Sequence, residues 1–129
     1  MHPVIITGAT AALTSLLFLY LAARVAGTRH REKIGIGDGG NKALNRAIRA
    51  HANLAEHAPF VLLLMLTYEL GGGAGWLLIA SGAVFVIARV LHAVGLLRTA
   101  GSSFGRFWGV VLTWIVLVVM ALANLVRLI

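Results

Sequence analysis

The first informative feature of this sequence is what it lacks. None of its 129 residues is cysteine. This absence excludes disulfides, iron–sulfur ligation and a thiol nucleophile on the protein, so any thiol chemistry must use a thiol that a ligand brings. Charged residues are also scarce, at 12% of the chain, about half the share found in soluble domains. Because so few polar side chains would leave a large apolar surface in water, we expect the chain to fold in a bilayer.

Long uncharged runs indicate where this chain crosses the bilayer. Residues 4–23 and 107–126 carry no charge, and about 20 apolar residues are enough to span the hydrocarbon core as a helix. Between them lie a segment that Asn41 can cap and an apolar segment interrupted by Arg89 and His92. We predict a single all-α domain over residues 1–129, a membrane-spanning up-and-down four-helix bundle. Its expected helices cover residues 3–26, 41–70, 75–98 and 105–127.

The excess of basic residues predicts how the bundle is oriented. Eleven Lys and Arg against four Asp and Glu give a formal net charge of +7 at pH 7. The expected loops around residues 27–40 and 99–104 are basic or flanked by arginines, whereas residues 71–75 carry no charge. The positive-inside rule places both basic loops in the cytoplasm and both termini on the other side. Since topology accounts for the positive charge, we expect membrane lipid and no nucleic acid as partner.

Several polar side chains interrupt the second and third helices. On the second helix, four of them fall within an arc of roughly 80° because they are three, four and three residues apart: Arg46, Arg49, Asn53 and Glu56. On the third helix, Arg89 and His92 share a face. An arginine at membrane depth is unfavourable by about 2.5–3.5 kcal/mol on insertion scales, so it should face a partner or a water-filled cavity.

Counting residues along both helices from the turn at 71–75 suggests which residue is the partner of Arg89. If the second and third helices are antiparallel, Glu56 lies level with Arg89, and Asn53 lies near His92. We therefore expect a polar cleft that opens to the cytoplasm, with basic groups at its rim and a Glu56–Arg89 ion pair at its floor. Such a cleft suits an anionic, hydrogen-bonding ligand.

Other interpretations of these residues remain open. The Glu56–Arg89 pair could serve only to fix the register of the helices. His51 and His92 could instead be the axial ligands of a haem in a small electron carrier. The spacing of His51, Glu56 and His57 is not that of a zinc site, and we expect no metal. The G-x-G-x-x-G pattern at residues 35–40 follows no strand, so it predicts a turn.

Two segments resemble the signatures of a known membrane family. Residues 45–56, NRAIRAHANLAE, followed by Pro59 and Phe60, resemble the second-helix signature of the MAPEG superfamily, the membrane-associated proteins in eicosanoid and glutathione metabolism. Residues 88–92, ARVLH, are similar to its third-helix signature. The GDGG loop at residues 37–40 resembles that of a poorly characterised bacterial inner-membrane branch. The resemblance extends over essentially the whole chain.

The resemblance implies a homotrimer in the bacterial inner membrane, with glutathione bound between subunits as a thiol cosubstrate. It implies a glutathione transferase or peroxidase of the microsomal type, acting on a lipophilic electrophile or hydroperoxide. Arg106 would be the catalytic residue that stabilises the thiolate. The residues that would bind glutathione are Arg29, Arg46, Arg49, Asn53, Glu56, Arg89 and His92.

Three positions depart from better known members of the superfamily. Asn45 replaces an acidic residue, Ala52 a basic residue and Leu96 a tyrosine. These departures weaken the expectation of tight glutathione binding. The missing tyrosine at Leu96 and the short loops favour an alternative in which the chain is a non-catalytic membrane scaffold or an accessory subunit of a larger complex.

Overall fold

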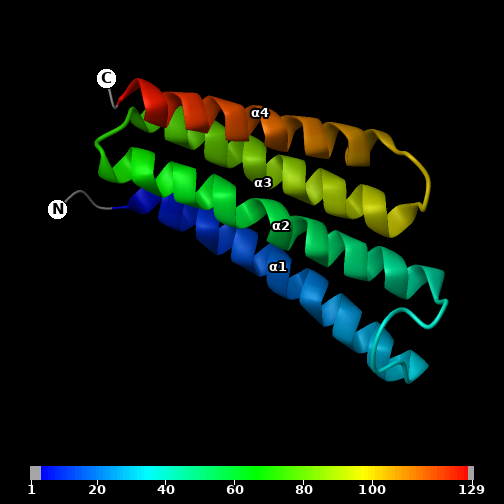
Figure 1. Ribbon diagram of the computed structural model, residues 1–129. Coiled ribbons are helices and arrows are strands. Elements are labelled where there is room, and N and C mark those ends of the chain that lie inside the picture. The colour runs from blue at the N-terminus through cyan, green and yellow to red at the C-terminus, as the bar shows by residue number, and fades with distance from the viewer. Residues whose placement is uncertain (1–3, 128–129) are drawn as a thin grey trace.

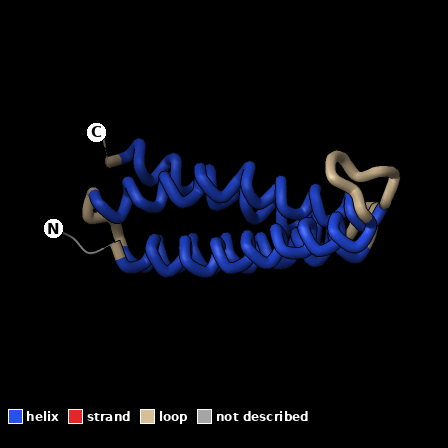
Figure 2. The backbone as a smooth tube through the Cα atoms, turned by 90° about the horizontal axis from the view of Figure 1, so that it is seen from below, coloured by secondary structure: helices blue, strands red, loops and turns tan. Residues whose placement is uncertain are grey.

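Four long helices form the fold of the described part of the chain (Figure 1). The computed structural model describes residues 4–127. Its helices are α1 (Ile5–Glu32), α2 (Lys42–Leu70), α3 (Gly75–Arg98) and α4 (Phe104–Val126), each antiparallel to the next. The beginning of α1 and the end of α4 lie beside the α2–α3 loop, and the two longer loops lie at the opposite end of the bundle (Figure 2). The predicted all-α, up-and-down four-helix bundle is confirmed.

Among the described helices, α1, α3 and α4 are long and apolar enough to cross a membrane. Helix α2 is longer than each of them, at 29 residues, but its first half is polar. It packs against each of the other three helices, so its polar side chains lie beside the spans of its neighbours. Many apolar side chains face outward, among them Leu16, Trp76 and Val118, as expected of a protein whose solvent is lipid.

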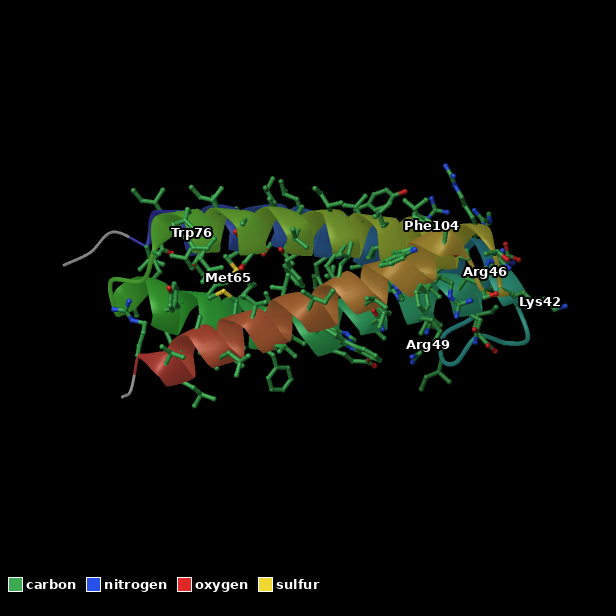
Figure 3. All side chains as sticks on the ribbon, turned by 90° about the horizontal axis from the view of Figure 1, so that it is seen from above. Lys42, Arg46, Arg49, Met65, Trp76 and Phe104 are labelled. Atoms are coloured by element: carbon green, nitrogen blue, oxygen red, sulfur yellow. The ribbon has the colours of Figure 1, made fainter. Side chains whose placement is uncertain are left out.

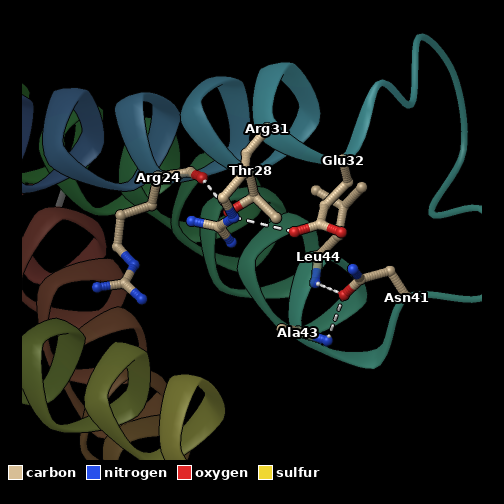
Figure 4. A network of polar contacts seen from close by, with 7 residues as sticks. All are labelled: Arg24, Thr28, Arg31, Glu32, Asn41, Ala43 and Leu44. Atoms are coloured by element: carbon tan, nitrogen blue, oxygen red, sulfur yellow. Dashed lines mark hydrogen bonds and ion pairs between the residues drawn. The ribbon is translucent and has the colours of Figure 1, made fainter.

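Helix α1 is longer than its apolar run. The sequence predicts its end at residue 26, but the helix continues to Glu32 and ends at Lys33, which adopts a left-handed conformation with φ 54°. Backbone hydrogen bonding does not depend on hydropathy, so the helix continues beyond the end of its apolar run. Within this extension, Thr28 donates its hydroxyl to the Arg24 carbonyl (Figure 4). The start predicted at residue 3 lies outside the described residues.

The first turn of α2 is capped as expected. Asn41 Oδ1 accepts the backbone N–H groups of Ala43 and Leu44, each at 3.0 Å (Figure 4). Such a cap satisfies two donors that the first turn leaves free. Three residues earlier, the Asp38 carboxylate accepts the Gly40 N–H and the Asn45 amide, and these hydrogen bonds lower its pKa. The loop is therefore fastened to the start of α2.

The core has two apolar parts. Near the chain ends, one cluster joins α2, α3 and α4 through Val61, Met65, Tyr68, Leu78, Phe85, Val116 and Met120. Toward the other end, a second cluster joins α1, α2 and α3 through Leu21, Ala50, Leu54, Ala93 and Leu96. The second cluster contains no residue of α4, so at that end α4 is not held by this apolar cluster.

Glycines allow α3 and α4 to approach closely at that end. A Cβ on Gly109 would lie 2.6 Å from His92 Cβ and 2.7 Å from the Ala88 carbonyl oxygen. A Cβ on Gly105 would lie 2.6 Å from the Leu91 carbonyl oxygen. Only a residue without a side chain fits at either position, so these glycines set the distance between the two helices.

We predict that Gly109→Ala destabilises the protein by about 1–3 kcal/mol, because overpacking forces the α3 backbone to move. Gly8→Ala is the matched control, since a Cβ at Gly8 meets nothing within 4 Å. It should be neutral or stabilising by up to about 1 kcal/mol through helix propensity. Thermal unfolding in detergent, followed by circular dichroism, measures both. Equal midpoints for the two variants would contradict the close approach.

Candidate functional site

Arg89 is the charged residue buried most deeply in the described part of the bundle, with 2% of its surface exposed. Its Nη1 donates to Asn53 Oδ1 at 2.7 Å, and its Nη2 donates to the Gly109 carbonyl at 2.6 Å. Its Nε is buried without a hydrogen-bond partner in the described structure. One guanidinium on α3 therefore links α2 to α4.

The expected ion pair between Glu56 and Arg89 does not form. Within residues 4–127, the one ion pair joins Arg31 to Glu32 at 2.9 Å. Residues three apart on a helix differ by about 60° around its axis, so Asn53 turns inward and Glu56 is exposed. Counting from the turn estimates depth along the helix, but it does not say which side chain points at the neighbour.

His92 holds the beginning of α4. Its side chain is buried, and its Nδ1 lies 3.0 Å from the Arg106 carbonyl oxygen, so it donates this hydrogen bond when Nδ1 carries the proton. Arg89 holds the Gly109 carbonyl one turn further along the same helix. Asn53, expected beside His92, bonds to Arg89 instead. Two polar side chains of α3 thus position the turn of α4 that carries Arg106.

Arg106 lies beside a small basic hollow. Its guanidinium Nη1 donates to the Ala100 carbonyl at 2.9 Å and to the Gly101 carbonyl. The hollow has a volume of about 110 Å³. It is lined by Asn45, Arg46, Arg49, Leu96, Thr99, Ala100 and Arg106. Figure 3 shows Arg46 and Arg49 at the end of the bundle where α4 begins. Arginines from α2 and α4 therefore surround one space.

The same arginine borders an apolar groove. This groove has a volume of about 340 Å³. It is lined by His92, Ser102, Ser103, Arg106, Phe107, Val110, Val111 and Trp114. Phe107 and Trp114 are exposed on the outer face of α4. Arg106 is the residue common to the hollow and the groove, so one cation lies between a basic space and an apolar one.

Two of the expected site residues lie apart from this arrangement. Arg29 Nη1 donates to the Gly37 carbonyl at 2.8 Å, so its side chain fastens the α1–α2 loop. Glu56, the middle residue of α2, lines neither the hollow nor the groove. The structure thus brings Arg46, Arg49 and Arg106 around one hollow and Asn53, Arg89 and His92 into one network.

The two histidines considered as haem ligands turn toward different helices. The His51 ring packs against Phe18 of α1, with ring centroids 4.4 Å apart. His92 faces the backbone of α4. This arrangement does not present the two imidazoles to a common iron atom.

Sequence reasoning missed the backbone partners in this region. The carbonyls of Ala100, Gly101 and Gly109 accept hydrogen bonds from arginines. Every residue has a backbone carbonyl, so a pattern of side chains cannot predict which carbonyl is the acceptor. The available signal was the spacing of Gly105 and Gly109, which permits the close approach of α4 to α3.

The model of the MAPEG family matches residues 7–126. The chain is similar to inner membrane protein YecN of Escherichia coli K12, with 34% identity over 119 residues, or 89% of this chain and 86% of that protein. The YecN sequence of E. coli O6:H1 matches with the same identity and coverage.

The bond between Asn53 and Arg89 can be tested with a double-mutant cycle. Asn53→Leu leaves a buried guanidinium nitrogen without its acceptor, and we expect a loss of about 1–3 kcal/mol. Asn53→Leu combined with Arg89→Leu should be less destabilised than the sum of the single variants, with a coupling of about 0.5–3 kcal/mol. Thermal unfolding in detergent measures each variant.

Glu56→Gln combined with Arg89→Leu is the control cycle, and its effects should add because the two side chains form no ion pair. If Glu56 shows the coupling and Asn53 does not, the observed network is wrong.

Proposed function

This chain belongs to the MAPEG family, and we propose that it binds glutathione at the basic end of the bundle and activates its thiol. The observation that carries the proposal is the position of Arg106. This residue lines both the basic hollow and the apolar groove on α4. An anionic thiol compound from water and an apolar compound from the bilayer can therefore meet at one guanidinium.

The binding step rests on the charge of the hollow. Glutathione carries two carboxylates, and guanidinium groups bind carboxylates through paired hydrogen bonds. Arg46 and Arg49 line the hollow from α2, and Arg46 Nε is buried without a partner in the described structure. These two arginines would bind the carboxylates, while Asn53, Arg89 and His92 form the support beneath them.

The chemical step needs a thiolate. A free thiol has a pKa near 8.5, and an adjacent cation favours the ionised form at neutral pH. The thiol would come from glutathione, since the chain has no cysteine of its own. Arg106 would supply the adjacent cation. The thiolate sulfur then bonds to the electrophilic carbon, and the leaving group departs with the electron pair of the broken bond. A lipophilic hydroperoxide is the alternative substrate class for the same thiolate.

A homotrimer would complete the site. The hollow, at about 110 Å³, is smaller than the roughly 300–1,000 Å³ of typical ligand pockets, so one chain encloses only part of glutathione. Arg49 and Glu56 are exposed on the outer edge of α2. A carboxylate exposed at mid-bilayer is unfavourable, and a neighbouring copy would shield Glu56 while adding a wall to the site. Three copies are what family membership suggests.

The proposed orientation follows the charges. YecN is an inner membrane protein by name, and three helices of the present chain can span a bilayer. With both basic loops in the cytoplasm, the hollow opens toward cytoplasmic glutathione. Both termini then lie on the other side of the membrane.

One observation favours a second candidate function. Leu96, whose apolar side chain cannot bond to a ligand, lines the hollow where better known members have tyrosine. A chain that has the family fold but catalyses no reaction would be an accessory subunit of a larger complex. Co-purification with one stoichiometric partner, without thiol-dependent activity, would support this alternative.

The test is ultraviolet difference absorbance of the glutathione thiolate on detergent-purified protein. We expect a thiolate signal in the parent and its loss in Arg106→Ala, because the neighbouring cation is removed. Arg98→Ala is the matched control: Arg98 is exposed at the end of α3 and lines neither space. This variant should keep the signal.

Two results would contradict the proposal. A folded parent oligomer that gives no thiolate would rule out thiol activation and favour the accessory subunit. An unchanged signal in Arg106→Ala would show that another group stabilises the thiolate.

A further inference from the structure

The end of α1 lies at the depth of lipid headgroups. The uncharged residues 4–23 span about 30 Å as a helix, which matches the hydrocarbon core. Arg24 Nη1 donates to the Tyr20 hydroxyl at 3.1 Å, and tyrosine is enriched at the membrane interface. Arg29 follows about 7 Å further along the helix axis. The last turns of α1 therefore pass through the headgroup layer.

A basic pocket opens at this depth. It has a volume of about 520 Å³ and is lined by Arg29, His30, Lys33, Ile34 and Gly35. The Arg29 side chain is held in place by its bond to the Gly37 carbonyl. The pocket shares no residue with the hollow around Arg106. It is thus a separate site with a fixed arginine.

The negative groups nearby are already engaged. The Glu32 carboxylate pairs with Arg31, and the Asp38 carboxylate accepts the Gly40 N–H and the Asn45 amide. The carbonyls of Arg29 and His30 accept the N–H groups of Ile34 and Lys33, which reduces the negative end of the α1 dipole. The two cations that line the pocket, Arg29 and Lys33, therefore outnumber the one nearby carboxylate that is not paired with a cation, Asp38, and the net charge around the pocket is positive.

We propose that this pocket binds the phosphate group of an anionic phospholipid. Charge complementarity selects the headgroup, because Arg29 and Lys33 line the pocket and no acidic residue does. The acyl chains have a surface to follow, since Leu16 and Leu19 lie on the His30 side of α1 and are 66% and 65% exposed. A free phosphate ion would make no use of that apolar surface.

Native mass spectrometry of the full chain in detergent tests the proposal. The parent should retain phosphatidylglycerol in preference to phosphatidylcholine. Lys33→Gln should weaken this retention about fivefold, the effect of one basic residue near an anionic surface. Lys42→Gln is the matched control, because it removes an exposed lysine at the other end of the same loop and outside the pocket. It should retain phosphatidylglycerol like the parent.

Four results would overturn the lipid site. Equal losses in Lys33→Gln and Lys42→Gln would indicate diffuse surface charge, and equal retention of both lipids by the parent would exclude selection by charge. Inorganic phosphate that displaces the lipid from the parent at millimolar concentration would show that the acyl chains add nothing. Lys33→Gln should also keep the glutathione thiolate signal; its loss would place Lys33 in the thiol site instead.

Discussion

The buried guanidinium of Arg89 is the interaction on which the arrangement of the helices depends. A charge in the interior of a membrane domain must be satisfied from within the protein. Arg89 obtains an acceptor from α2, Asn53 Oδ1, and another from α4, the Gly109 carbonyl. The second acceptor is within reach only because Gly105 and Gly109 let the two backbones approach. The position of Arg106, on the same turns of α4, follows from this contact.

The two ends of the bundle are built differently. At the end with the chain termini, the Glu69 carboxylate accepts the N–H groups of Ile6 and Thr7 at 2.9 and 2.7 Å, and Asn124 and Arg127 bond across to α2 and its loop. These contacts close that end. At the opposite end, basic side chains surround a hollow and a pocket. Because both proposed ligands are anionic, we place them at this basic end of the bundle.

Much of the fold could be predicted from the sequence because the bilayer imposes simple requirements on it. The uncharged runs locate the spans, and Asn41 marks the start of α2. The end of α1 could not be predicted in this way, since its last residues are polar and hydropathy does not show where a polar helix ends. For the site, spacing identified the polar face of α2 as the place where the partner of Arg89 lies. It failed to distinguish Asn53 from Glu56, because both lie on that face and only one of them points inward.

The sequence by itself determined the class of protein, the number of helices, the family and the residues that do not belong in lipid. The class, the helices and the misplaced polar residues follow from composition and periodicity along the chain, whereas the family follows from the resemblance of residues 45–56 and 88–92 to known signatures. Only the tertiary structure decided that Arg89 bonds to Asn53 and to a backbone carbonyl, and that Arg106 lies between a basic hollow and an apolar groove. Those contacts depend on how each helix is rotated about its axis and how closely its neighbour approaches, and no spacing along one chain segment encodes either quantity.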